Sequence, residues 1–167
     1  GTPDPSADIE VISLLWRFLS ELGLPGLTLK LNSLGRAEDR ARYIPNLVTF
    51  LKEHAARLCG NCQRRIYTNP LRVLECKVPE CRTVTESAPH LMDYLSPDAR
   101  EHFDRVLAGL QTLAIPYTLN PRLVRGLDYY CLTAFELTCS FLGAQNAVGA
   151  GGRYDTLVET LEGPPTP

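Results

Sequence analysis

Four cysteines in two close pairs are the residues whose spacing most directly suggests chemistry. Two residues separate Cys59 from Cys62, four separate Cys76 from Cys81, and thirteen lie between the two pairs. Thiolates at such spacings reach a single tetrahedral Zn²⁺ from two turns of the chain. The pattern therefore indicates a structural zinc site, and it is equally compatible with four thiols that bind no metal.

A redox interpretation of the first pair is also open. Cys59-Gly60-Asn61-Cys62 has the spacing of a thioredoxin-type pair. That chemistry places the first cysteine at the N-terminus of a helix, where the helix dipole lowers the thiol pKa. The apolar periodicity predicts a helix before Cys59 instead, so we rank this interpretation lower. His54 lies near the pair but fits an exposed helix face, and we do not expect it to be a ligand.

A second group of residues combines an arginine, tyrosines and glycines. Arg125 presents a planar fork of donors that suits a carboxylate or a phosphate. Tyr129 and Tyr130 are adjacent, so on a strand they point to opposite faces, and phenols can line a pocket. Gly151 and Gly152 allow close approach of the backbone to a ligand, or simply tight packing. Together these residues indicate a pocket for an anion and a small ligand.

Composition narrows the class of protein. The chain has 167 residues, 44% of them hydrophobic and 22% charged, as in a soluble globular protein. The net charge is −2, yet residues 52–82 carry seven Lys and Arg against three Glu, a local surplus of four positive charges. No apolar run approaches the roughly 20 residues of a membrane span. The first eight residues do not read as a secretory signal. We therefore expect a cytoplasmic protein with reduced cysteines and no membrane partner.

Periodicity and turn residues predict the elements that position these side chains. Asp4-Pro5 and Ser96-Pro97 read as an N-cap followed by proline at the first helical position. Residues 59–97 show little periodicity and many turn residues. Cys131 and Cys139 fall on one face of a predicted strand and are expected in the core. We expect helices over residues 5–22, 44–58, 97–113 and 154–161, with Pro45 near the start of the second, and strands over 27–31, 115–119, 129–139 and 144–148.

Two longer motifs carry a family resemblance. Residues 125–130 (Arg-Gly-Leu-Asp-Tyr-Tyr) and 149–155 (Gly-Ala-Gly-Gly-Arg-Tyr-Asp) resemble the two histidine-specific motifs of class II histidyl-tRNA synthetases, in the same order. Residues 64–74 and 96–120 are similar to the insertion domain of that family, and residues 29–35 are similar to the strand that leads into it. The resemblance covers essentially the whole chain.

The fold implied by the resemblance is α+β. It is part of a class II antiparallel catalytic sheet, interrupted by a mainly helical insertion domain. The implied division is a catalytic segment over 1–35, an insertion domain over 36–113 that contains the four cysteines, and a catalytic segment over 114–167. The four-cysteine arrangement is not a general feature of the family, so the resemblance does not imply zinc.

The resemblance also implies an activity. Family members use ATP with Mg²⁺ to convert histidine to histidyl-adenylate and then transfer the acyl group to tRNA(His). Arg125 would be the catalytic residue, contacting the α-phosphate and the histidine carboxylate. The insertion domain would lie against the tRNA acceptor arm, and the full-length protein would be a homodimer. The residues implied to line the histidine pocket are Tyr129, Tyr130, Tyr154, Gly151 and Gly152.

Departures from the family pattern leave other functions open. Class motifs 1, 2 and 3 and the anticodon-binding domain are not found in these residues, so we expect a fragment that is inactive alone. One alternative is a stand-alone zinc-containing module that binds the tRNA acceptor arm. Another is the synthetase-like regulatory subunit of histidine biosynthesis. That paralogue lacks the insertion domain, and we rank it low.

Overall fold

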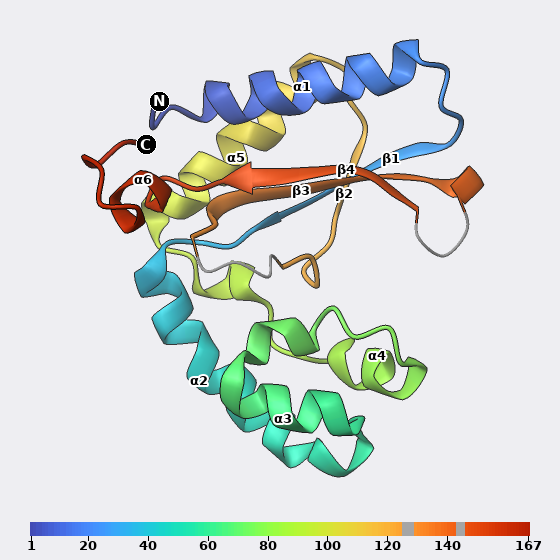
Figure 1. Cartoon of the computed structure of the whole chain (residues 1–167), viewed down its shortest axis with the longest axis vertical. Coiled ribbons are helices and arrows are strands. Elements are labelled where there is room, and N and C mark those ends of the chain that lie inside the picture. Colours follow the sequence, from blue (N-terminus) through green and yellow to red (C-terminus); the bar gives the residue numbers. More distant parts are fainter. Residues whose placement is uncertain (125–128, 143–145) are drawn as a thin grey trace.

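The computed structural model describes residues 1–124, 129–142 and 146–167 (Figure 1). In these residues four strands form one sheet, in the order β2-β1-β3-β4. β1 (Leu27–Ser33) pairs antiparallel with β3 (Cys131–Cys139), which pairs antiparallel with β4 (Ala147–Arg153). β2 (Tyr117–Leu119) joins the edge parallel to β1. The predicted α+β class with an antiparallel sheet is confirmed, and the short β2 adds one parallel pairing.

Two helices, α1 (Pro5–Glu21) and α5 (Pro97–Thr112), pack on one face of the sheet (Figure 1). α1 begins as predicted, since the Asp4 carboxylate accepts the Ser6 N–H and proline follows. Gly23 has a φ of +72° just after the helix, a conformation that glycine adopts without strain. The core beneath these helices consists of Ile12, Leu19, Leu29, Leu31, Phe103, Val106, Leu110, Ile115, Phe135 and Leu137.

Residues 36–95, here called the helical module, lie on the other side of the sheet (Figure 1). They contain α2 (Ala37–Glu53), α3 (Gly60–Thr68) and α4 (Pro79–Thr85), with 3₁₀ turns between them. The prediction that the helix over residues 44–58 starts near Pro45 was wrong, because α2 begins at Ala37 and this proline lies inside it. Residues 59–97, predicted to be mostly turns, contain two further helices. Each has fewer than ten residues, which is too short to show a clear apolar period.

The helical module has a core of its own. Leu47 and Leu51 of α2 pack with Ile66 of α3 and Val84 of α4, and all four are buried. α5 contributes instead to the core of the sheet. The predicted limits of the insertion, residues 36–113, stay a prediction, and the packing groups α5 with α1 and the sheet. Among the described residues, no helix combines the length and the apolar character that crossing a bilayer requires.

The two ends of the helical module are joined by one buried carboxylate. Asp39, 0% exposed, accepts the Arg36 N–H at 2.8 Å and the Ser96 N–H at 2.9 Å. It also accepts from the Arg42 guanidinium at 2.6 Å. Gly35 has a φ of +57°, and a Cβ there would lie 2.7 Å from Asp39 and 3.0 Å from Leu95. The chain therefore leaves β1 and enters α5 at the same point.

Replacing this carboxylate should destabilise the fold. We expect Asp39→Ala to lower the free energy of unfolding by about 3 kcal/mol, because two partly buried N–H groups and the Arg42 guanidinium lose a buried acceptor. Glu38→Ala is the matched control, since Glu38 lies in the same helical turn and is exposed. It should change stability by less than about 0.5 kcal/mol. Urea unfolding followed by circular dichroism measures both, and equal effects would contradict the role given to Asp39.

Candidate functional site

Three tyrosines from the two predicted histidine-specific motifs come together. The ring centroids of Tyr130 and Tyr154 lie 5.9 Å apart at 89°, and those of Tyr129 and Tyr154 lie 6.1 Å apart at 80°. Tyr129 and Tyr130 are themselves 4.9 Å apart. The prediction that the adjacent pair points to opposite faces was wrong, because both residues precede β3 and are not in a strand. The three rings form one aromatic cluster.

Two of these rings line a groove of about 930 Å³ between α1 and the sheet. This volume is within the usual range for small-molecule sites. Val11, Leu14 and Phe18 of α1 form an apolar wall, and each is more than half exposed. Tyr129 belongs to the aromatic cluster but is not among the residues that line the groove. The described residues that line its opposite side include Tyr130, Thr133, Phe135, Gly151, Gly152 and Tyr154.

The glycines lie within a strand and not after one. β4 runs through Gly149 to Arg153, so the prediction that this glycine segment follows a strand ending at Val148 was wrong. A Cβ on Gly151 would lie 2.6 Å from the Phe135 ring. A Cβ on Gly152 would lie 2.7 Å from the Thr133 carbonyl oxygen, which belongs to the backbone. The glycines therefore let β4 approach β3, and their place in the wall of the histidine pocket stays a prediction.

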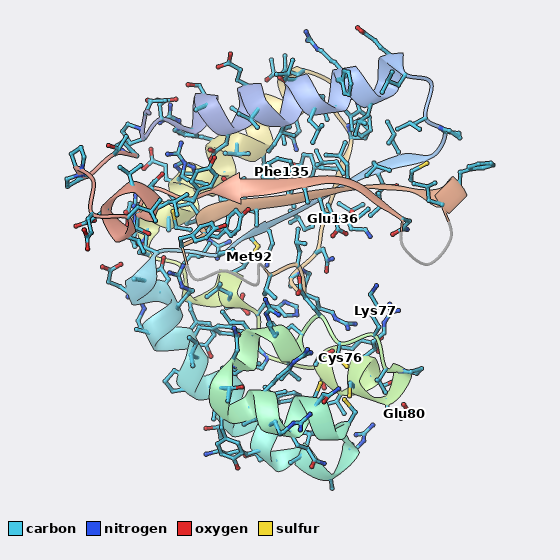
Figure 2. The ribbon with its side chains drawn as sticks, in the orientation of Figure 1. Cys76, Lys77, Glu80, Met92, Phe135 and Glu136 are labelled. Atoms are coloured by element: carbon cyan, nitrogen blue, oxygen red, sulfur yellow. The ribbon has the colours of Figure 1, made fainter. Side chains whose placement is uncertain are left out.

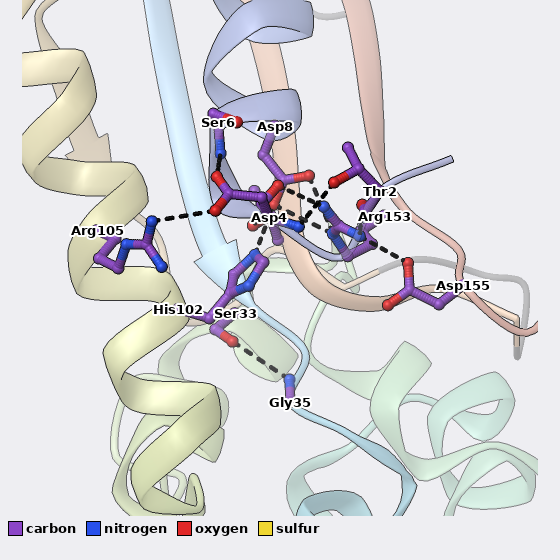
Figure 3. A network of polar contacts seen from close by, with 11 residues as sticks. Thr2, Asp4, Ser6, Asp8, Ser33, Gly35, His102, Arg105, Arg153 and Asp155 are labelled. Carbon is purple, nitrogen blue, oxygen red and sulfur yellow. Dashed lines mark hydrogen bonds and ion pairs between the residues drawn. The ribbon is translucent and has the colours of Figure 1, made fainter. Parts of the chain in front are cut away.

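A buried ionic network supports the groove (Figure 3). Asp8, in the first turn of α1, accepts from the Thr133 hydroxyl at 2.7 Å and from Arg153 Nε at 3.1 Å. His102 Nε2 of α5 lies 2.7 Å from the same carboxylate. The remaining Arg153 nitrogens donate to the Thr2 and Asp4 carbonyls and to the Asp155 carboxylate, at 2.9 to 3.0 Å. The network joins α1, α5, β3 and β4.

Arg153 serves the protein and not a ligand. Its side chain is 5% exposed, and all three guanidinium nitrogens donate to protein acceptors. Burial alone lowers the pKa of Arg153, but the charges of Asp8 and Asp155 outweigh it and raise that pKa. The sequence prediction missed this network. Arg153 belongs to the motif of residues 149–155, but its side chain was assigned no role from the sequence. The residues near Asp8 do not indicate a partner 145 residues away.

A second arginine ties the helical module to the aromatic cluster. Arg40 Nη1 of α2 donates to the Tyr130 carbonyl at 3.2 Å and lies 3.3 Å from the Leu34 and Gly35 carbonyls. The register of β3 against β4 shifts between Cys131 and Ala134. This irregularity lies at the start of β3, directly after Tyr130, and bulges re-aim neighbouring side chains. Arg125, the predicted catalytic residue, lies with residues 126–128 outside the described residues, and its position stays a prediction.

The four paired cysteines form a cluster on the helical module. Their Sγ atoms all lie within 4.8 Å of one another, and all but Cys59 are buried. The Sγ atoms of Cys59 and Cys76 are 3.9 Å apart, and the Cys59 N–H donates to Cys81 Sγ at 3.2 Å. Cys131 and Cys139 lie outside this cluster and are buried, as predicted for core residues.

Cys59 lies at the N-terminus of a helix, the position that a redox cysteine requires. α3 begins at Gly60, so Cys59 is its N-cap, and the prediction that a helix lies only before it was wrong. The Cys62 N–H stabilises the Cys59 thiolate and lowers the pKa of Cys59 to about 7. Burial raises the pKa of Cys62. A redox pair still leaves Cys76 and Cys81 unexplained. His54 stacks on Phe50 with its Nδ1 2.9 Å from the Phe50 carbonyl, and it is not part of the cluster.

Comparison with known proteins decides the family. A family model described as histidyl-tRNA synthetase matches residues 1–167. The chain belongs to the histidyl-tRNA synthetase family. It is similar to the histidine–tRNA ligase of Maridesulfovibrio salexigens, with 54% identity over 98% of this chain and 40% of the relative. The histidine–tRNA ligase of Synechococcus is 53% identical over 100% of this chain and 40% of its own length.

A solved structure agrees with this assignment. The crystal structure of apo histidyl-tRNA synthetase from Staphylococcus aureus is 36% identical, with a TM-score of 0.73 over 99% of this chain and 40% of that one. The chain therefore spans about 40% of the length of these histidyl-tRNA synthetases. The predicted resemblance is confirmed, and neither the stand-alone module nor the regulatory subunit is favoured.

The close contact of β4 with β3 can be tested by adding one methyl group. We expect Gly152→Ala to lower the free energy of unfolding by about 2 kcal/mol, because its Cβ meets a backbone oxygen that cannot move alone. Gly149→Ala in the same strand is the control, since its Cβ meets only the tip of the Leu15 side chain. It should cost less than about 1 kcal/mol. Thermal or urea unfolding compares the two, and a larger loss for Gly149→Ala would refute this account.

Proposed function

We propose that the full-length protein containing this chain is a histidine–tRNA ligase. It activates histidine with ATP to form histidyl-adenylate and transfers the acyl group to tRNA(His) in the cytoplasm. The proposal depends on one observation: a groove lined by Tyr130 from one histidine-specific motif and Tyr154 from the other, 5.9 Å apart. The six cysteines are not joined in disulfides, as in a reducing cytoplasm. Dimerisation stays a prediction from the family.

The chemistry of the groove suits an imidazole. A neutral imidazole has one N–H donor and one nitrogen acceptor, and a phenol hydroxyl can complement either. Tyr130 and Tyr154 place two phenols at one side of the groove, where their rings also provide apolar contact. The wall formed by Val11, Leu14 and Phe18 lowers the local polarity and strengthens such hydrogen bonds. Tyr129 supports the other two rings, meeting Tyr154 edge-on and Tyr130 at a tilt of 33°.

Arg125 is proposed to act in the activation step. The histidine carboxylate attacks the α-phosphorus of ATP, and pyrophosphate leaves with the electrons of the broken P–O bond. Two anions must approach each other, and a guanidinium that contacts both offsets their repulsion. The proposal is supported by the chain on either side of this residue. Val124 is buried in the core of the helical module, and Tyr129 is in the aromatic cluster.

Magnesium is expected with ATP, but its ligands are not supplied by this part of the groove. Among the described residues lining it, the carboxylate side chains are Asp8 and Asp155, and both accept hydrogen bonds from Arg153. Mg²⁺ requires free oxygen ligands in octahedral geometry. The described residues do not fit a magnesium site, and no step of the proposed reaction is assigned to them through this ion.

The helical module is proposed to contact the acceptor arm of tRNA(His). The exposure of its basic side chains supports this role, because exposed cations can contact the phosphates of the tRNA. Such contacts release counterions and add affinity without reading the base sequence. The exposed basic residues between residues 52 and 82 of the module are Lys52, Arg57, Arg64, Arg72, Lys77 and Arg82.

Histidine-dependent exchange of pyrophosphate into ATP tests the activation step. We expect the full-length protein to catalyse this exchange with histidine and with no other standard amino acid. Arg125→Ala should lower the rate by at least about 100-fold, because a charge that stabilises the transition state is lost. Tyr154→Phe should raise the KM for histidine by about 10-fold through a lost hydrogen bond.

Controls make this test specific. Tyr117→Phe removes a phenol that bonds Gln111 outside the groove and should leave exchange unchanged. The chain of residues 1–167 alone should show no exchange. Exchange with a different amino acid, or an Arg125→Ala variant as active as the parent, would contradict the proposal.

Charge reversal on the helical module tests the tRNA contact separately. We expect Arg57→Glu and Arg64→Glu each to raise the KM for tRNA(His) in aminoacylation by about 10-fold, because phosphate attraction becomes repulsion. Pyrophosphate exchange, which needs no tRNA, should be unchanged. Arg17→Glu on α1 is the control, since Arg17 is also exposed but lies outside the module. If Arg17→Glu weakens tRNA use as much as the module variants, the surface is wrongly assigned.

A further inference from the structure

We infer that Cys59, Cys62, Cys76 and Cys81 bind one structural Zn²⁺ that holds the helical module together. This site is separate from the groove, and family membership does not imply it. It joins the segment around the start of α3 to the segment around the start of α4. Figure 2 shows sulfur atoms gathered beside the labelled Cys76 at these two helices.

The geometry of the cluster is close to that of a zinc tetrathiolate. Zn–S bonds of about 2.3 Å in a tetrahedron place the sulfur atoms about 3.8 Å from one another. The Sγ atoms of Cys59 and Cys76 are 3.9 Å apart, and no pair in the cluster exceeds 4.8 Å. Movements of about 1 Å, which are rotations of side chains, bring all four sulfurs onto a single ion.

The type of ligand selects the metal. All four donors are sulfur, which suits Zn²⁺ and other soft ions, whereas Mg²⁺ and Ca²⁺ require oxygen. Four ligands and no further nearby His or carboxylate make a closed coordination shell among the described residues, as in a structural and not a catalytic zinc site. The Cys59 N–H that donates to Cys81 Sγ adds the kind of backbone hydrogen bond that orients a metal thiolate.

The helical module has a physical need for such a cross-link. α3 has nine residues and α4 has seven, and isolated helices of this length are not stable in water. The core between them includes the thiols themselves, because Cys62, Cys76 and Cys81 are buried with Val73 and Val84. Modules this small commonly depend on a metal for part of their folding energy.

Packing contacts connect the cysteine cluster to the groove. The Leu74 carbonyl, two residues before Cys76, accepts from Arg122 Nε at 3.1 Å. Val124 is buried in the same core as Cys76, and Tyr130 packs against that core. The metal therefore fixes a surface that holds the chain on both sides of residues 125–128. Loss of zinc should unfold the helical module first and disturb the tyrosines second.

Metal analysis of the full-length protein, purified without chelators or a histidine tag, tests the inference. We expect about one zinc per chain in the parent protein by mass spectrometry of the metal. Cys62→Ser and Cys81→Ser should each retain less than about a tenth of that zinc, because one thiolate of four is removed. Cys139→Ser is the matched control, since this buried thiol donates to the Pro25 carbonyl outside the cluster and its variant should keep the metal.

A second measurement covers variants that fail to fold. Removing zinc from the parent protein with a chelator should expose four thiols to a thiol reagent and lower helical content. Re-addition of Zn²⁺ should reverse both changes, and Co²⁺ should give the visible bands of a tetrahedral thiolate complex. A parent protein that neither contains nor takes up zinc would overturn the inference. So would iron in its place, a disulfide within the cluster, or zinc retained in Cys62→Ser and Cys81→Ser.

Discussion

The carboxylate of Asp8 is the contact on which the geometry of the groove depends. It receives hydrogen bonds from Thr133 on β3 and Arg153 on β4, and His102 on α5 contacts the same oxygen as Thr133. Removing one partner of such a buried pair leaves an uncompensated charge, which costs about 3–5 kcal/mol. The network therefore fixes how far α1 lies from the sheet. That distance sets the width of the groove between the α1 side chains and the tyrosines.

The close approach of the β4 backbone to β3, on the other side of the groove, follows from the same contact with Asp8. Arg153 ends β4 and is held by Asp8, so the two glycines before it are drawn against β3. Only a residue without a Cβ fits where Gly152 meets the Thr133 carbonyl. The Tyr130 carbonyl is in turn held by Arg40 from α2. Contacts from α1 on one side of the sheet and from the helical module on the other thus position the groove. The tyrosine rings occupy the space between them.

Local chemistry made part of this structure predictable from sequence. Asp4-Pro5 marks a helix start because an N-cap acts within one turn, and the cysteine spacing indicates a cluster because short loops bring such pairs together. The contact between Asp8 and Arg153 was not predictable, since no local pattern records a partner 145 residues away. The pairing of Tyr129 with Tyr130 was also missed. Its geometry depends on where β3 begins, and strand limits are set by the neighbouring strands and not by the residues alone.

The helical module is attached within the connection between β1 and β2, and this attachment bears on how the protein can evolve. The helical module departs after Gly35 and rejoins at Ser96, and Asp39 binds the two ends to each other. A segment attached in this way is an insertion. The residues between its two ends take no part in the pairing of the strands or in the packing of α1 on α5. Selection can lengthen, shorten or replace it while the sheet stays in register. Gain or loss of a four-cysteine cluster would then leave the pairing of β1 with β3 intact and act on the groove only through the core that Tyr130 and Val124 share with the module.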